Sequence, residues 1–302
     1  MTFDYIIIGA GSAGCVLANR LSADPGVRVL LLEAGGRDWR PEIKIPAAFS
    51  HLFKTAVDWN YETEPQPGCA NRRLYWPRGK VLGGSSSLNA MIYMRGHADD
   101  YDGWAARGNA GWSYAELLPY FKRSENNQRG AFNDFHASGG PQHVIDLPDP
   151  NAMSAAFIDG FESLGVRRTT DFNGAAQEGI GINQVTMRGA RRWSAADAYL
   201  RPALRRANLS LRTRAHTTRI LIEAGRAIGV EFRVRGRMET VRAAREVILC
   251  GGAINSPQLL LLSGVGPADS LREHGIAVVR DAEGVGDNLQ DHLVCGVIVG
   301  VN

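Results

Sequence analysis

Residues 4–21 of the chain read DYIIIGAGSAGCVLANRL, which is a short β-branched run, a glycine-rich turn and a helical pattern in direct succession. A second apolar run, residues 27–32, follows and reads as a buried parallel strand with Glu33 at its carboxyl end. Strand, glycine turn, helix and strand in this order predict a βαβ unit of the dinucleotide-binding type. A glycine-rich turn that serves only packing is the alternative.

The glycines of this turn have separate roles in the predicted unit. Gly9 permits the tight turn, Gly11 lets the backbone approach a pyrophosphate, and Gly14 lets helix and strand pack closely. The amides at the start of the helix, which include those of Ser12 and Ala13, and the helix dipole then face the phosphates.

An acidic residue at the end of the second strand completes the pattern. Glu33 lies 19 residues after Gly14, near the spacing at which an acid accepts hydrogen bonds from a ribose hydroxyl. An acid at this position disfavours a 2′-phosphate. The motif alone does not choose between NAD and FAD, since both offer adenosine and pyrophosphate.

Composition is that of an ordinary soluble globular protein. The 302 residues suffice for one large domain or two interleaved ones. A content of 44% hydrophobic and 22% charged residues excludes a disordered or collagen-like chain. Acids and bases are mixed along the whole chain at a formal net charge of +3, so no concentrated phosphate-seeking face is visible and nucleic acid is not an expected partner.

Cysteine spacing and apolar run length predict a cytoplasmic protein without a bound metal. The cysteines lie far apart with no CxxC spacing, at Cys15, Cys69, Cys250 and Cys295, which argues against a zinc site or a redox dithiol. No apolar run approaches the roughly 20 residues that span a bilayer, so we expect no membrane span. The first residues do not read as a targeting leader.

A second glycine-rich loop, residues 78–91, reads RGKVLGGSSSLNAM. Such a loop can offer backbone N–H groups and hydroxyls to an anion or a polar ring edge, with a plain turn as the alternative. The sequence here resembles the glucose-methanol-choline (GMC) oxidoreductase family of FAD enzymes, whose first signature is matched by residues 79–101. Residues 252–266 match the second signature position by position. Shorter matches extend the resemblance over nearly the whole chain, at residues 58–59, 192–196 and 286–292.

The resemblance implies where FAD is bound. In the family, the positions matching residues 11–14 hold the pyrophosphate, and the one matching Glu33 holds the adenosine ribose. The segment matching residues 81–92 runs along the pyrophosphate and isoalloxazine, and Thr217 falls where the family's backbone meets adenine. The positions expected to bind the cofactor are Gly9, Gly11, Ser12, Ala13, Gly14, Glu33, Ala34, Val81, Gly84, Ser85, Asn89, Ala90, Met91, Ile92, Thr217, Cys250 and Gly251.

One departure from the family pattern concerns how the flavin is held. Some members attach it covalently through a histidine just before the asparagine of the serine loop, and that position here is Leu88. Because a leucine cannot form this bond, the resemblance implies noncovalent FAD.

The carboxyl-terminal part of the chain predicts that the FAD domain is discontinuous. Residues 217–223, 227–235 and 238–241 read as three short antiparallel strands joined at glycines. Residues 246–250 read as a further strand that returns to the parallel sheet beside the first βαβ unit.

The middle of the chain predicts a lid and part of a second domain. Residues 96–135 form a lid-like segment with a helix at 113–123, and a helix at 152–164 and a strand-like run near 182–187 follow. The expected fold class is α/β, a Rossmann-like FAD-binding domain with a parallel sheet and a β-meander, plus part of an α+β substrate domain. The expected FAD domain comprises residues 1–135 and 201–292, and the partial substrate domain comprises residues 136–200 and 293–302.

The resemblance implies an FAD-dependent oxidoreductase acting on the CH–OH group of a small-molecule alcohol, with hydride transfer to flavin N5 giving an aldehyde or ketone. A base that accepts the hydroxyl proton helps this reaction, a role suited to histidine. The family's catalytic histidine lies near the carboxyl end of longer chains, so we expect it outside these residues and assign no catalytic residue. No catalytic position of the family is matched by His51, His97, His136, His143, His216, His274 or His292.

Two other functions stay open from the sequence. One is a truncated FAD-binding fragment that catalyses nothing, and the other is a family hydroxynitrile lyase that keeps FAD structurally and cleaves a cyanohydrin. The sequence does not specify the alcohol, the electron acceptor or the oligomeric state.

Overall fold

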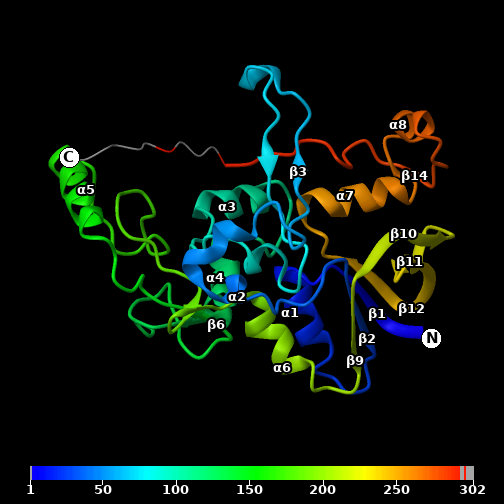
Figure 1. Ribbon diagram of the computed structural model, residues 1–302, viewed down its shortest axis with the longest axis horizontal. Helices are drawn as coiled ribbons and strands as arrows, with labels where there is room; N and C mark the ends of the chain where they lie inside the picture. Colours follow the sequence, from blue (N-terminus) through cyan, green and yellow to red (C-terminus); the bar gives the residue numbers. More distant parts are fainter. Residues whose placement is uncertain (1, 293–295, 297–302) are drawn as a thin grey trace.

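A six-stranded sheet forms the centre of the computed structural model, which describes residues 2–292 and residue 296 (Figure 1). Parallel pairing joins β12, β1, β2 and β9 in that order, and the antiparallel strands β10 and β11 extend the sheet beyond β12. The predicted α/β fold with a parallel sheet and a β-meander is confirmed. The strands of this sheet are β1 (Thr2–Ile8), β2 (Val29–Glu33), β9 (Leu209–Thr213), β10 (Ala215–Glu223), β11 (Arg226–Val234) and β12 (Arg237–Leu249).

Apolar layers cover both faces of the sheet. Successive strand residues point to opposite faces, so Ile7 and Ile6 enter different cores. On one face, α1 (Ser12–Leu21) and the π-helical turn Ala196–Leu200 pack against the sheet. On the other face, α7 (Gly252–Leu262) packs against the sheet, and apolar side chains of the meander strands enter the same core. This double cover explains why every residue of β2, Val-Leu-Leu-Leu-Glu, is buried.

The strand β12 differs from the sequence-based prediction. Residues 238–241 and 246–250 read as two separate strands, whereas the structure has one strand from Arg237 to Leu249. Its first half pairs antiparallel with β11 and its second half pairs in parallel with β1. The stretch in between, Arg-Ala-Ala-Arg, stays extended because its backbone pairs with the first residues of β1, Thr2 opposite Arg242 and Phe3 opposite Ala243.

The remaining segments lie on the outside of the sheet. The predicted helix at 113–123 is observed as α4 (Tyr114–Ser124), and Ser113 and Glu116 cap its amino terminus reciprocally. The predicted helix at 152–164 is α5 (Ala152–Ser163), whereas the run near 182–187 forms only the short strand β7. The other elements are α2 (Pro41–Lys44), β3 (Tyr61–Glu62), β4 (Tyr75–Trp76), α3 (Ala98–Ala106), β5 (Glu125–Asn127), β6 (Gln142–Val144), β7 (Met187–Arg188), β8 (Arg191–Arg192), α6 (Arg201–Ala203), β13 (Val265–Gly266), α8 (Ala268–Glu273), β14 (Arg280–Asp281) and the 3-10 turns Pro46–Leu52, Pro67–Cys69 and Gly84–Ser87.

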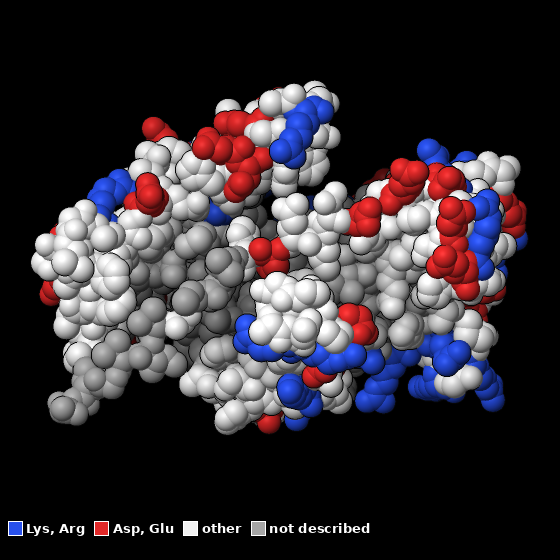
Figure 2. Space-filling view, turned by 90° about the horizontal axis from the view of Figure 1, so that it is seen from above, with Lys and Arg blue, Asp and Glu red and all other residues white. Residues whose placement is uncertain are grey.

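The exterior carries a projecting arm and charges of both signs. β3 and β4 form an arm that rises from the body at the top of Figure 1. The face in Figure 2 shows Lys and Arg side by side with Asp and Glu at the right-hand end of the molecule, where α8 and the meander lie. Within residues 2–292 and 296, no helix combines the length and the apolar character needed to cross a membrane.

The domain division stays a prediction. The π-helical turn Ala196–Leu200 packs in the same core as Ile7 and α1, so the last residues of the expected substrate segment contact the central sheet. Of the second expected piece, residues 293–302, all but residue 296 lie outside the described residues.

A buried ionic network joins the segments of the lid and substrate region. Arg95 Nη2 donates to Glu125 Oε2 at 3.1 Å, and His136 places Nδ1 2.9 Å from Glu125 Oε1 and Nε2 3.0 Å from Asp171 Oδ1. Glu125 and His136 are fully buried. Burial tends to raise the pKa of the Glu125 carboxyl, but the hydrogen bonds from His136 and Asn127 outweigh it and hold this pKa below its ordinary value of 4.5.

We predict that Glu125→Gln lowers the free energy of unfolding at pH 7 by about 3 kcal/mol, because it leaves the buried Arg95 without its counter-charge. Since the pKa of Glu125 is lower in the folded state than in the unfolded state, its contribution is present above the ordinary value and is lost as the pH falls through the folded value. Urea unfolding should therefore show a weaker loss of stability below pH 4.5 in the variant than in the wild type. The exposed Glu283→Gln is the control, and equal stability of the two variants at pH 7 would contradict the prediction.

Candidate dinucleotide site

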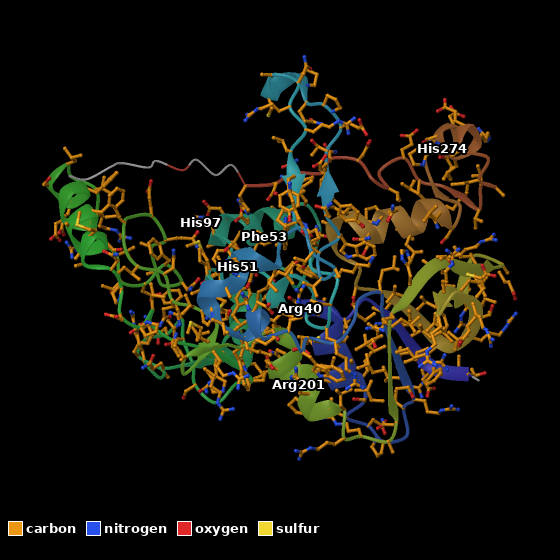
Figure 3. The ribbon with its side chains drawn as sticks, viewed as in Figure 1. Arg40, His51, Phe53, His97, Arg201 and His274 are labelled. Atoms are coloured by element: carbon orange, nitrogen blue, oxygen red, sulfur yellow. The ribbon has the colours of Figure 1, made fainter. Side chains whose placement is uncertain are left out.

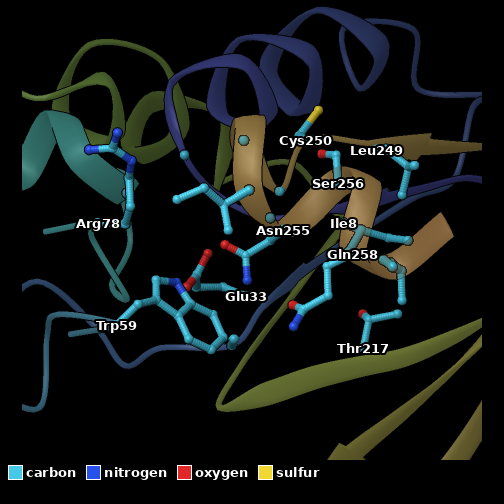
Figure 4. A pocket seen from close by; sticks show the side chains of 18 of the residues that line it. Ile8, Glu33, Trp59, Arg78, Thr217, Leu249, Cys250, Asn255, Ser256 and Gln258 are labelled. Carbon is cyan, nitrogen blue, oxygen red and sulfur yellow. The ribbon is translucent and has the colours of Figure 1, made fainter. Parts of the chain in front are cut away.

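A pocket of about 490 Å³ opens where the parallel strands end (Figure 4). The turn after β1, the end of β2, the junction between β12 and α7, and the start of β10 contribute to its walls, and residues of the 78–85 loop complete them. Carboxyl ends of neighbouring parallel strands meet at one edge of a sheet, which is where ligands bind in open α/β folds.

The glycines of the first turn differ in what surrounds them. A Cβ at Gly9, where φ is +98°, would lie 2.5 Å from the carbonyl oxygen of Cys250, and a Cβ at Gly14 would lie 1.9 Å from that of Gly9. At Gly11, by contrast, a Cβ would meet no protein atom closer than 4.0 Å. Gly9 and Gly14 therefore allow close backbone packing, whereas Gly11 keeps the space of the pocket open.

The amino terminus of α1 faces this pocket with Ser12 and Ala13 in its wall. Among the described residues, no side chain caps this terminus, and its first turn contains no acid. The free N–H groups and the positive end of the helix dipole are therefore available to an anion.

The serine loop lies directly on the first glycine turn. A Cβ at Gly84, where φ is +53°, would be 2.7 Å from the Cα of Gly11, and a Cβ at Gly79 would be 2.3 Å from the backbone carbon of Gly84. Gly83 N–H donates to the carbonyl of Ala10 at 2.8 Å. These contacts hold Gly84 and Ser85 in the wall of the pocket.

Glu33 is 5% exposed and ties the loops after β1 and β2 together. Its Oε2 accepts from the Ala10 N–H and its Oε1 from the Gly35 N–H, both at 2.8 Å. Burial raises the pKa of Glu33 to about 7, although these two hydrogen bonds and the nearby Lys80 lower it. A ligand hydroxyl that donates to this carboxylate would favour its charged form.

The other end of the pocket combines apolar walls with an unpartnered hydroxyl. Ile8 and Leu249 line it, and the Oγ1 atom of Thr217 is buried without a hydrogen-bond partner among the described residues. The Trp59 indole lines the pocket on the side of Glu33 (Figure 4), with His216 edge-on to it at 5.5 Å between ring centroids. Burial, together with the charges of Lys80 and Arg233, lowers the pKa of His216.

These features fit an elongated ligand with phosphates in the middle and a polar base at one end. Gly11 leaves room for a close approach, the uncapped helix supplies donors, Glu33 supplies an acceptor, and Thr217 supplies a buried hydroxyl that needs a partner. The Cys250 thiol in the wall stays protonated at neutral pH because burial raises its pKa to about 11. In the part of the chain that the structure describes, no cluster of His, Cys, Asp or Glu could hold a metal ion.

Most of the predicted cofactor positions lie in this pocket, but not all of them. Gly14 packs against Gly9, and Val81 is buried in a separate apolar cluster with Ile43 and Leu52. Met91, at a φ of +63°, packs with Val185. Asn89, Ala90 and Ile92 are exposed outside the pocket. The predicted positions that line the pocket are Gly9, Gly11, Ser12, Ala13, Glu33, Ala34, Gly84, Ser85, Thr217, Cys250 and Gly251.

Some residues that line the pocket were not among the predicted positions. Trp59 and Arg78 come from the loop that leads to the serine loop, and His216 precedes Thr217. Asn255 and Gln258 project from the first turns of α7 (Figure 4). Residues 58–59 and 252–266 match the family pattern, so the sequence carries a signal for Trp59, Asn255 and Gln258.

A buried arginine holds the end of the serine loop. Arg192, 1% exposed, donates from Nε to the carbonyl of Ile43 at 2.8 Å and from Nη1 to Asn89 Oδ1 at 2.7 Å and the carbonyl of Ser86 at 3.2 Å. The Asn89 oxygen also accepts from the N–H of Met91. Arg192 therefore fixes the orientation of the Asn89 side chain just beyond the pocket.

The fold and this pocket define a dinucleotide-binding α/β protein. The chain belongs to the GMC oxidoreductase family, whose profile matches residues 3–294. The family is FAD-dependent.

Similar proteins with assigned activities include alcohol dehydrogenase [acceptor] of Pseudomonas putida, which is 47% identical over 99% of this chain and 55% of its own length. Mitochondrial choline dehydrogenase of Mus musculus is 49% identical over 96% of this chain and 50% of its own length. The chain thus spans about half the length of the curated relatives it matches.

Solved structures of other proteins superimpose closely on this chain. Pyridoxine 4-oxidase from Mesorbium loti superimposes with a TM-score of 0.89 at 39% identity, covering 92% of this chain and 55% of its own. An FAD-dependent oxidoreductase from Chaetomium thermophilum gives a TM-score of 0.90 at 32% identity, covering 96% and 52%.

We predict that Gly11→Val weakens FAD binding by about 100-fold or more, which corresponds to roughly 2.8 kcal/mol, because the new side chain enters the pocket. The fold should tolerate the change, since a Cβ at Gly11 meets no protein atom closer than 4.0 Å. Fluorescence titration of FAD and thermal unfolding of the FAD-free chain measure the two effects. Gly68→Val, at the tip of the arm with open space around it, is the control, and normal affinity in Gly11→Val would refute the placement.

A second prediction concerns the pH dependence of FAD binding. Ribose hydroxyls that donate to Glu33 favour its charged form, so FAD affinity should rise with pH up to the folded pKa of about 7 and level off above it. In the FAD-free chain the same raised pKa makes stability fall as the pH rises from 4.5 to about 7. Glu33→Gln should weaken FAD binding at pH 8 by about 1.5 to 3 kcal/mol and remove both pH dependences.

Calorimetric titration across this pH range, with Glu283→Gln as the control, tests the assignment of Glu33. An unchanged pH profile in Glu33→Gln would show that another group is responsible.

Proposed function

We propose that this chain binds FAD noncovalently as part of an oxidoreductase acting on the CH–OH group of an alcohol. The observation that carries the proposal is the pocket at the end of β1, where Gly11 leaves open space beside an uncapped helix terminus. Similarity to an alcohol dehydrogenase and a choline dehydrogenase supports an alcohol as the substrate class.

Each part of the pocket has a partner in FAD. The N–H groups of Ser12 and Ala13 donate to the pyrophosphate, the Glu33 carboxylate accepts from the adenosine ribose, and the Thr217 hydroxyl lies at the adenine end. Gly84 and Ser85 cover the pyrophosphate from the opposite wall. Ile8 and Leu249 add apolar surface to the wall of the pocket.

The position before Asn89 supports noncovalent binding. Leu88 is buried in an apolar cluster with Ile43, Leu52, Val57 and Val81. An aliphatic side chain held in such a cluster offers no nucleophile to the flavin, so the contacts of the pocket alone would retain the cofactor.

The bound FAD would accept the hydride released when the alcohol becomes a carbonyl compound. The hydroxyl proton needs a separate acceptor. The histidines of the described residues have other partners or positions: His97 caps α3, His136 lies between Glu125 and Asp171, and His216 stands at the adenosine end. We therefore assign FAD binding to this chain and no catalytic residue.

The purified chain should be yellow, and acid precipitation should release the flavin into the supernatant. Flavin in the precipitate would refute noncovalent binding, and a chain that takes up no FAD when it is supplied would refute the proposed cofactor. Val57→Thr, which lies in the apolar cluster rather than in the pocket, should keep its flavin and serves as a control variant.

The substrate class is tested on the FAD-loaded chain without oxygen. Choline, an aliphatic primary alcohol and benzyl alcohol are each added, and bleaching of the flavin by at least one of them supports alcohol oxidation. Because no base is assigned, added imidazole should accelerate the bleaching by accepting the proton. Flavin that stays oxidised with every alcohol would limit the function of this chain to cofactor binding.

A further inference from the structure

A second cavity, of about 510 Å³, shares no lining residue with the dinucleotide pocket. Its walls carry five cationic side chains, two carboxylates and two indoles. The cations come from α2, the β7–β8 hairpin and the start of α6, where Figure 3 labels Arg201. Nothing in the proposed function uses this cavity.

The two carboxylates of the cavity are already neutralised. Lys44 Nζ lies 3.0 Å from Asp38 Oδ2 and 2.7 Å from Asp197 Oδ2. Arg201 contacts the same two acids, with Nη2 2.6 Å from Asp38 and Nε 2.9 Å from Asp197. Two cations and two anions thus form a closed network without net charge, which leaves the remaining cations of the wall uncompensated.

The remaining cations include two arginines that face each other. Arg188 and Arg191 are directly opposite across the β7–β8 hairpin, so their side chains project from the same face of the ribbon. Among the described residues, neither forms an ion pair with an acid. The positive charges of Arg188 and Arg191 repel each other in this arrangement, and no acid among the described residues pairs with either arginine to relieve the repulsion.

The adjacent Arg192 adds a third positive charge. It is buried, and its hydrogen bonds go to the neutral oxygens of Ile43, Ser86 and Asn89 rather than to a carboxylate. Burial lowers its pKa to about 10, while the nearby Asp197 acts in the opposite direction. The guanidinium therefore remains charged at neutral pH, and the cavity carries a surplus of three positive charges.

We propose that this cavity binds a small molecule that bears a phosphate or polyphosphate group. A multiply charged anion between Arg188 and Arg191 replaces their repulsion with charge-assisted hydrogen bonds, and guanidinium groups match phosphate oxygens in a bidentate geometry. The walls also offer Trp39, which is 74% exposed, as a surface on which the base of a nucleotide can stack. The phosphate group is the shared requirement, whether it is inorganic or carried by a nucleotide.

Calorimetric titration tests this site in the presence of saturating FAD, so that the dinucleotide pocket is filled. Inorganic phosphate, pyrophosphate, AMP and ATP are the probes, used on the wild type and on Arg188→Gln/Arg191→Gln. We expect pyrophosphate to bind the wild type and the double variant to bind it about ten-fold more weakly or worse. The control is Arg235→Gln/Arg237→Gln, which removes the same charge from another hairpin, and it should bind as the wild type does. The single variants give the same test if the double variant does not fold.

The outcomes of this titration distinguish a nucleotide site from a site for inorganic phosphate, and they show whether the proposal fails. Nucleotides that bind more tightly than pyrophosphate, with this advantage lost in Trp39→Ala, would identify a nucleotide site. Equal affinity for pyrophosphate and nucleotides would identify a site for inorganic polyphosphate. Absence of binding by all four probes, or equal weakening in the control variant, would overturn the proposal. Because the readout is the effect of the Arg188 and Arg191 changes, it is independent of whether the chain retains FAD.

Discussion

Three stretches of backbone meet at the end of β1 at distances that only glycine allows. Gly14 lies on the carbonyl of Gly9, Gly9 lies on that of Cys250, and Gly84 lies on the Cα of Gly11. A side chain at Gly9 would push away the start of α7, one at Gly14 would push away α1, and one at Gly84 would push away the serine loop. The packed backbone therefore determines the shape of the pocket, and the side chains only complete its walls.

Buried charge in this protein is often satisfied by dipoles rather than by an opposite charge. Glu33 accepts from two backbone N–H groups, and Arg192 donates to two carbonyls and an amide oxygen. Such partners hold a charge in place without neutralising it, so the field of the charge remains available to a ligand. The network around Glu125 is different, because there the buried carboxylate pairs directly with the Arg95 guanidinium and the result is structural.

The sequence was informative where backbone requirements and residue type coincide. The first βαβ unit and the meander could be predicted because glycine turns and apolar runs mark their limits. The continuity of β12 could not be predicted, since residues 242–246, Arg-Ala-Ala-Arg-Glu, lack the β-branched and apolar residues typical of a strand. They are held extended by pairing with β1, a partner far away in the chain. For the site, motif matching selects Gly9, Gly11, Gly84 and Glu33, which all line the pocket. It could not show that the Asn89 side chain is held by the buried Arg192 or that Trp59 and His216 meet at the pocket, because these contacts depend on tertiary packing.

The position of β1 between β2 and β12 has a consequence for synthesis on the ribosome. Ile8 pairs with Leu32 on one side and with Leu249 on the other, so one edge of β1 finds its neighbour only after the residues between Ile8 and Leu249 have been made. At roughly 5 to 20 residues per second, the nascent strand waits on the order of 10 to 50 seconds with that edge unpaired. An unpaired apolar edge is a template for aggregation. The strand order that builds the pocket thus also exposes one edge of β1 to aggregation during synthesis.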